Sequence, residues 1–330
     1  MTTATSPAVP QAPPTPNPTA APLRARQSYR HEAFLWHDRA DYLAGLVPFV
    51  LEGLDLGEAV LVGATGEHQR WLVAALGPRA AEVRFVDVAQ LACNPVRIMP
   101  ALLELLDECC GPDRPARGVG EPIWPGRSPA EVSEAQLHEA LLNLAVDPDL
   151  PFWLICPYGV EQLDAEGLAD LERSHPVIAT ATSYAGSGSY RGRDHARALF
   201  TADLPDLGEP AADLWATEPR LDLTVEQVTL EAASRDLLSD RVVLLTTLVR
   251  GLVAEGARRG ADGARLRLWD EPEHLVCEVA DRTVVDDFLI GRRTPAPGRH
   301  DAVWSANQAC DLVQVRSNRG GTSVRLHLGK

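Results

Sequence analysis

Several features that would assign a protein to a well-defined class are missing from this sequence of 330 residues. Its six cysteines include no Cys-x-x-Cys pair and no cysteine–histidine cluster with zinc-ligand spacing, so the spacing supports neither a disulfide framework nor a structural metal. No apolar run is long enough to cross a bilayer, and the N-terminus lacks a basic segment followed by an apolar one. We therefore expect a cytoplasmic protein with no membrane partner.

Positive charge is also scarce. The 31 Lys and Arg residues are outnumbered by 46 Asp and Glu residues, which gives a formal net charge of −15. Such a chain repels a phosphate backbone, and it has no basic run that would overcome the total charge, so we expect no nucleic-acid partner. The 45% of hydrophobic residues is enough to fill the cores of two domains.

The first half of the chain has the pattern of an α/β domain. Residues 1–24 consist almost entirely of Pro, Ala and Thr and are expected to be a disordered leader. From residue 29, short apolar segments alternate with stretches of helical periodicity, as a parallel sheet covered on both faces requires. We place a three-layer α/β domain at residues 29–182, with expected helices at 41–54, 67–76, 96–109, 129–145 and 164–174.

The second half begins after an irregular segment. Residues 183–222 are rich in Gly, Pro and Asp and are interpreted as a linker. Residues 223–330 then show two helical stretches, a hairpin pattern, a further helix and a second hairpin, which predicts an α/β sandwich. The expected helices span 225–238, 241–259 and 302–310.

A dense group of special residues lies between residues 118 and 143. Glu121 stands where an apolar strand ends, at the edge where parallel sheets bind ligands. Glu134 and His138 are one helical turn apart, a spacing that suits a metal or a polar ligand. The spacing alone favours a simpler interpretation, an ion pair on the surface of an amphipathic helix.

The same region resembles a known family of sensory domains, the MEDS domains. The resemblance covers about residues 29–178 and depends on the segments YRHEAFLW, LVPFVLEGLDLGEAVLVGAT, NPVRIMP, GEPIW, HEALLN and LICPYG. It implies a RecA-like fold and a small-molecule signal. The segment has no Walker A pattern, so the resemblance does not extend to nucleotide hydrolysis. The expected pocket residues are His31, Glu121, Arg127, His138 and Glu139.

Residues 223–330 resemble a second family, the histidine-kinase-like ATPase domains of anti-sigma-factor serine/threonine kinases. The closest segments are LLTTLVRGLVAEGARRGADGARLRLW, HLVCEVADRT and VWSANQACDLVQVRSNRGGTSVRLHL. The resemblance implies ATP or ADP as a ligand, with Mg²⁺. In that family, four short sequence motifs, or boxes, surround ATP. In the first box, Gly251 replaces a glutamate and Glu255 replaces an asparagine that binds Mg²⁺. Glu255 is therefore the candidate metal ligand, but no residue remains to activate a nucleophile.

The other boxes of this family are retained unequally. Asp281 occupies the position of the family's adenine-binding aspartate, with Thr283 in place of the glycine that follows it in the family. Residues 300–303 occupy the position of the glycine-rich lid without any glycine, and Asp301 brings negative charge where phosphate would bind. The last box is intact and comprises Gly320, Gly321 and Thr322.

The replaced residues are those that contact the phosphates and Mg²⁺ in the family, whereas the residues that contact adenine are retained. We interpret the module as a pseudokinase with weakened or absent ATP chemistry, no catalytic residues and little expectation of Mg²⁺. The alternative for the last box is that its glycines only form the hairpin turn.

The sequence predicts a signalling regulator of the anti-sigma-factor type, whose sensory domain controls a kinase-fold module that binds a sigma factor or an anti-sigma antagonist. An active serine/threonine kinase that phosphorylates the antagonist is the alternative. A small-molecule enzyme in the first domain is disfavoured, because no nucleophile has a base at a recognisable spacing.

Overall fold

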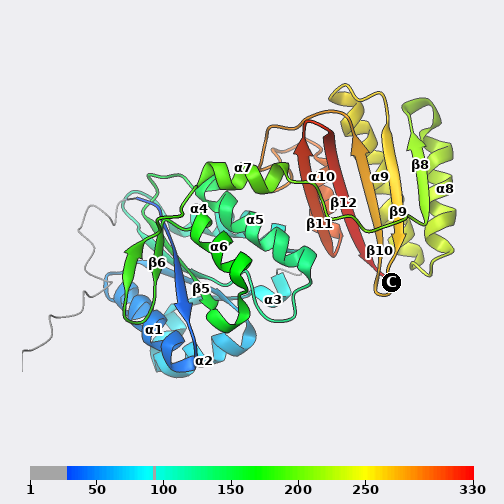
Figure 1. Cartoon of the computed structure of the whole chain (residues 1–330). Helices are drawn as coiled ribbons and strands as arrows, with labels where there is room; N and C mark the ends of the chain where they lie inside the picture. The colour runs from blue at the N-terminus through cyan, green and yellow to red at the C-terminus, as the bar shows by residue number, and fades with distance from the viewer. Residues whose placement is uncertain (1–27, 92–93) are drawn as a thin grey trace, which may run out of the picture.

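The computed structural model describes residues 28–91 and 94–330 and contains two lobes, each built on its own β-sheet (Figure 1). The first sheet has seven strands in the order β3-β2-β4-β5-β1-β6-β7, parallel except for the last pair. The second has five antiparallel strands in the order β11-β12-β10-β9-β8. The predicted mixed α/β fold, with a mainly parallel sheet and a second antiparallel sheet, is confirmed. The expected leader, residues 1–24, lies outside the described residues.

The first lobe follows the expected alternation of strands and helices. Its strands are β1 (Arg30–Trp36), β2 (Ala59–Ala64), β3 (Arg84–Asp87), β4 (Ala116–Gly120), β5 (Phe152–Gly159), β6 (Val177–Ala179) and β7 (Tyr184–Gly186). Its helices are α1 (Arg39–Asp55), α2 (Gly66–Leu76), α3 (Val88–Leu91), α4 (Ile98–Cys109), α5 (Pro129–Ala145) and α6 (Ala165–Ser174).

Strand β5 shows how this lobe forms three layers. Its eight residues are all buried, and successive side chains point to opposite faces of the sheet. Phe152 and Leu154 belong to the core beneath α4, α5 and α6, whereas Trp153 and Ile155 belong to the core beneath α1 and α2. A strand that is apolar throughout is required because both faces are covered.

Helix α5 is enclosed on more than one side. It begins with a capping box, in which Ser128 and Glu131 satisfy each other's backbone amides. The sheet lies beneath the helix, while α7 (Arg193–Thr201) and β11 (Leu312–Asn318) contact its outer side. As a result Glu134 and His138 are both buried, and the simpler interpretation of a surface ion pair is wrong.

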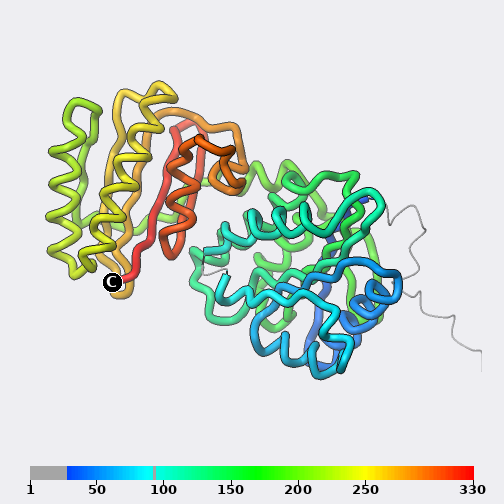
Figure 2. Tube along the Cα trace, turned by 180° about the vertical axis from the view of Figure 1, so that it is seen from behind, coloured from blue at the N-terminus to red at the C-terminus, as the bar shows by residue number. Residues whose placement is uncertain are grey.

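In the second lobe, the helices lie on one face of the antiparallel sheet (Figure 2). The strands are β8 (Ala212–Ala216), β9 (Ala264–Asp270), β10 (His274–Asp281), β11 and β12 (Gly321–Gly329). The helices are α8 (Leu221–Ala233), α9 (Ser239–Arg258) and α10 (Ala302–Ala309). Within the described part of the chain, no helix is long and apolar enough to span a membrane.

The segment 183–222, interpreted from its composition as a linker, contributes to both lobes. It supplies β7 to the first sheet and β8 to the second, with α7 between them. Between α7 and β8, the chain crosses the polar face of the second sheet. There the carbonyl of Pro205 accepts from Arg325, and the carbonyl of Gly208 accepts from the Trp269 indole at 3.0 Å. Its Gly, Pro and Asp residues fit this path because it has backbone contacts but little regular structure.

A buried ionic contact joins the two lobes. The carboxylate of Glu134, on α5, lies 2.7 Å from Arg292 and 2.6 Å from Arg316 of the second lobe. None of the Glu134 side chain is exposed, and both arginines are nearly as buried. We call these three residues the Glu134 clamp. One carboxylate paired with two guanidinium groups leaves a net positive charge, and burial lowers the pKa of Arg292.

A second set of polar contacts lies beside the clamp. Arg97 donates to the carbonyl oxygens of Asn307 and Cys310, each at 2.7 Å, and Asn94 donates to the Asn307 carbonyl at 3.2 Å. These two carbonyls belong to the C-terminal turn of α10, so cationic and amide donors from the first lobe satisfy backbone acceptors that the helix leaves unpaired.

The clamp predicts that the substitution E134Q destabilises the protein. The neutral amide leaves two buried guanidinium groups without their anion, so we expect the free energy of unfolding to fall by about 3 to 5 kcal/mol. Urea unfolding measures this loss. The matched control E166Q changes an exposed glutamate on α6 and should alter stability by no more than about 0.5 kcal/mol. Equal stabilities of the two variants would contradict the role of the clamp.

Candidate functional site

Four metal-ligand side chains meet in the core of the first lobe, beneath α5. They come from β1, α5, β5 and the residue after α6, and are His31, Glu139, Cys156 and His175. One ligand atom from each lies within 4.8 Å of the others, and all four residues are buried. His31 Nε2 is 3.3 Å from both the Cys156 sulfur and Glu139 Oε2, and His175 Nε2 is 2.9 Å from the same carboxylate oxygen. We call this set the His-Glu-Cys cluster.

The proton positions on both imidazoles follow from their outer partners. His175 Nδ1 lies 2.9 Å from the Leu171 carbonyl, which only accepts, so this nitrogen carries a proton. Asn143 donates its amide to the Ser174 carbonyl at 2.8 Å, which leaves its oxygen to accept from His31 Nδ1 at 3.2 Å. In the neutral form of each ring, the Nε2 lone pair therefore points into the cluster.

Burial and charge shift the titration of the cluster. Burial acts to raise the pKa of Glu139, but its close contacts with the His175 and His31 imidazoles outweigh this effect and hold the pKa well below its usual range. The Tyr158 hydroxyl also donates to this carboxylate at 2.8 Å. Burial, followed by the nearby Glu139 charge, raises the pKa of the Cys156 thiol well above its usual range. Burial lowers the pKa of His175.

A small cavity borders the cluster on the side of α4. Its volume is about 70 Å³. The wall is mostly aliphatic, and its ionisable side chains, among the residues that the structure describes, are Glu121, His138, Glu139 and Cys156. Burial lowers the pKa of His138 to about 4, so its imidazole is neutral near pH 7. The cavity therefore suits a small, mostly apolar molecule with at most a few polar atoms.

The structure brings four of the five expected pocket residues to this region. His31 and Glu139 belong to the His-Glu-Cys cluster, whereas Glu121, His138 and Glu139 line the cavity. Arg127 is in neither set: its guanidinium lies 3.6 Å from the centre of the Trp124 ring and 3.6 Å from Glu131.

Sequence reasoning missed Cys156 and His175. They lie 125 and 144 positions after His31, so no local spacing identified them as its partners.

Glu121 has a positioning role at the edge of the sheet. Its carboxylate accepts from the Thr65 amide at 2.9 Å and contacts His68, while its own amide bonds to the Gly63 carbonyl. These contacts join the end of β4 to the turn between β2 and α2. The carboxylate is therefore largely engaged by the protein itself.

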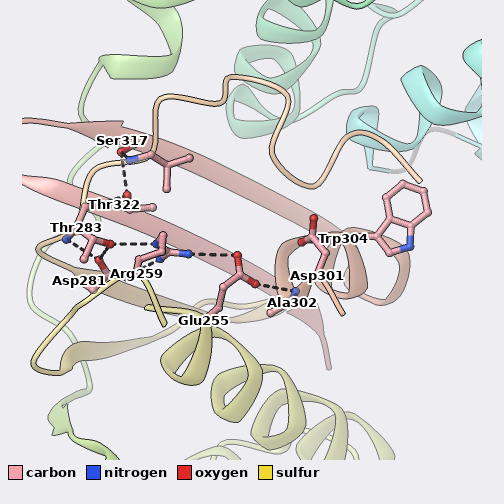
Figure 3. Close-up of polar contacts among 10 residues, drawn as sticks. Glu255, Arg259, Asp281, Thr283, Asp301, Ala302, Trp304, Ser317 and Thr322 are labelled. Atoms are coloured by element: carbon pink, nitrogen blue, oxygen red, sulfur yellow. Dashed lines mark hydrogen bonds and ion pairs between the residues drawn. The ribbon is translucent and has the colours of Figure 1, made fainter. Parts of the chain in front are cut away.

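In the second lobe, Arg259 lies between Asp281 and Glu255, two residues of the expected nucleotide site (Figure 3). Arg259 donates to Asp281 at 2.7 Å, lies 3.2 Å from Glu255 and donates to the Thr283 hydroxyl at 3.0 Å. The other oxygen of Asp281 accepts from the backbone amide and the hydroxyl of Thr283. Both oxygens of Asp281 and both oxygens of Glu255 have partners within the chain.

The N-terminus of α10 is also occupied by the chain's own carboxylates. Asp301 accepts from the Trp304 amide at 2.8 Å, and Glu255 accepts from the Ala302 amide at 2.9 Å. Amides at this end of a helix are the groups that would meet a phosphate. Gly251 lies nearby on α9, where a Cβ atom would approach Ala302 to 3.3 Å. Two acidic side chains thus stand where the resemblance places phosphate.

The Gly-Gly-Thr box closes against the end of β10. Gly321 has φ = +128°, and a Cβ atom there would lie 2.0 Å from the Asp281 carbonyl oxygen. The Thr322 hydroxyl donates to the Thr283 carbonyl at 2.7 Å and contacts Ser317 at 2.8 Å. Gly320 carries no such constraint, since the nearest atom to a Cβ atom there is 3.1 Å away in the side chain of Asn318.

Comparison with known families bears on the first lobe. Residues 30–176 match the sequence model of the MEDS family, described as MEthanogen/methylotroph, DcmR Sensory domain. The predicted MEDS domain is thereby confirmed, and a sensory domain suggests a role in signalling. No curated protein matches the sequence.

The packing of Gly321 predicts a sharp difference between two adjacent glycines. G321A combines an unfavourable φ with a backbone clash, so we expect it to lower the free energy of unfolding by about 3 kcal/mol or more. G320A should cost less than about 1 kcal/mol, because the neighbouring Asn318 side chain can move. Urea unfolding of both variants checks this. Similar losses would show that Gly321 is not held against β10 as described.

Proposed function

We propose that this protein is a signal-transduction regulator, in which the MEDS domain at residues 30–176 binds a small molecule and controls the second lobe through α5. The observation that carries the proposal is the position of three buried side chains on this one helix. His138 and Glu139 line the cavity, and Glu134, one turn earlier, holds the two arginines of the second lobe.

The cavity is the proposed input site. Its aliphatic wall favours an apolar molecule, and its volume of about 70 Å³ limits that molecule to a few heavy atoms. The three-layer order of strands and helices is compatible with the RecA-like fold that the resemblance implies, and ligands of such sheets lie beyond the ends of the strands, where Glu121 stands. A bound molecule would press on the face of α5 that carries His138.

The tight packing around α5 allows binding at the cavity to affect the second lobe. A buried helix cannot tilt or slide without disturbing what it contacts, because interiors are packed as densely as crystals. The Glu134 clamp is directional and has short contacts to both arginines, so a small shift of α5 changes its geometry. The second lobe is thereby coupled to the occupancy of the cavity.

The second lobe is the proposed output module, of the histidine-kinase-like ATPase type found in anti-sigma-factor kinases. Arg259 pairs with two residues that the resemblance assigns to the nucleotide site, and Asp301 and Glu255 cap the helix that would meet the phosphates. A nucleotide could bind here only by breaking these contacts, and the free energy that they contribute would be subtracted from its binding. We infer that the module acts by binding a sigma factor or an anti-sigma antagonist, without phosphoryl transfer.

The input site predicts stabilisation by small ligands. A series of one- to four-carbon alcohols and haloalkanes is screened by thermal shift on the full chain, and a binder at 100 times its Kd should add about 2.7 kcal/mol of stability. The variant A101L fills the cavity from α4 and should abolish the shift, whereas A165L, on the exposed start of α6, should retain it. A screen without any stabilising compound, or equal responses of A101L and wild type, would contradict the proposed input.

The output module predicts that nucleotide chemistry is absent. Isothermal titration of the full chain with ATP and Mg²⁺ should show no saturable binding below about 1 mM, and radiolabel transfer to anti-sigma antagonist proteins should not occur. The double substitution E255N/A302G removes one carboxylate from the end of α10 and should raise nucleotide affinity at least about tenfold, a gain of about 1.4 kcal/mol. Robust phosphate transfer by the natural chain would overturn the proposal in favour of an active kinase.

A further inference from the structure

We propose that the His-Glu-Cys cluster binds a divalent transition-metal ion, with zinc as the best match, through His31, Glu139, Cys156 and His175. The site lies in the core of the MEDS domain and does not depend on the proposed function, because a metal could hold this core together in a domain that senses nothing.

The separations of the donor atoms fit a tetrahedral site. Zinc binds nitrogen and oxygen at about 2.0 to 2.2 Å and sulfur at about 2.3 Å, so ligand atoms in a tetrahedral site lie about 3.3 to 3.6 Å apart. His31 Nε2 already has this separation, 3.3 Å, from both Glu139 and Cys156. No separation among the four exceeds 4.8 Å, so small side-chain rotations complete the geometry.

The outer hydrogen bonds are those that metal-binding histidines make. Each ring donates its Nδ1 proton away from the cluster, His175 to the Leu171 carbonyl and His31 to the Asn143 side chain. Both Nε2 atoms are then free to coordinate, and their orientation is fixed. The Tyr158 hydroxyl holds the Glu139 carboxylate in the same way.

A positive charge is required between His175 and Glu139. With Nδ1 protonated, the neutral ring turns a lone pair toward a carboxylate oxygen 2.9 Å away, and two lone pairs repel at this distance. A proton could bridge these two atoms, but it would leave the convergence of His31 and Cys156 unexplained. A metal ion takes all four donors at once.

The balance of charge also favours a divalent ion. When the Cys156 thiol releases its proton to solvent, the sulfur gains a lone pair for the metal, and the thiolate and the Glu139 carboxylate together carry two negative charges. These cancel the charge of the ion, so the site is neutral, as a fully buried site requires. Two imidazoles and a thiolate disfavour Mg²⁺ and Ca²⁺, which prefer oxygen, and suit zinc.

Cobalt substitution tests the site in the full chain. The purified protein is stripped with a chelator and titrated with Co²⁺, and we expect one ion per chain, the visible bands of a tetrahedral ion and a near-ultraviolet thiolate-to-cobalt band. Zinc should displace the cobalt. C156S should lose the near-ultraviolet band, whereas C110S, which changes a buried cysteine outside the cluster, should retain it. H175Q should weaken binding at least about tenfold.

The titration of the wild-type protein decides the matter even where a variant fails to fold. The absence of a thiolate-to-cobalt band in folded wild-type protein would overturn the proposal and show that protons alone hold the cluster together. A band that persists unchanged in folded C156S would also overturn it, because the ion would then be bound by another cysteine.

Discussion

The burial of α5 is the constraint from which the arrangement of this protein follows. The helix lies between the first sheet and elements from the C-terminal half of the chain, so Glu134, His138 and Glu139 have almost no access to water. A buried charge must find its partner inside the protein. Glu134 pairs with two arginines of the other lobe, and Glu139 contacts two histidines of its own lobe. Both carboxylates thus obtain buried cationic or hydrogen-bonding partners, and they lie about one and a half helical turns apart on the same helix.

Local patterns in the sequence predicted the longer helices outside residues 183–222 because each helix depends on neighbouring residues, but they did not predict α7, β7 or β8 within that segment. The helix expected at 129–145 has those bounds in the structure, since Pro129 and the capping residue before it define its start. The sites were predicted only in part. Glu121 was identified from the end of a strand and Glu139 from the helical segment that follows it, and His31 was included with the family resemblance. Cys156 and His175 join them only through the pairing of β1 with β5 and β6.

The burial of Glu134 could not be read from its spacing to His138. A carboxylate one turn from a histidine is usually solvent-exposed, and only the packing of the second lobe against α5 reverses this expectation. Arg259 was missed for a related reason. The resemblance identifies which residues of the expected nucleotide site differ from the family, but not that a guanidinium from the end of α9 pairs with both Glu255 and Asp281.

The path of residues 183–222 bears on how such a protein can arise by gene fusion. Strand β8, within this segment, forms the edge of the second sheet beside β9, and the chain before it covers that sheet's polar face. A recombination event that joined the second lobe to another sensor at residue 223 would remove both. The unit that can be inherited intact therefore begins well upstream of the helices of that lobe, and exchange of sensors is restricted to partners that can accept the crossing segment.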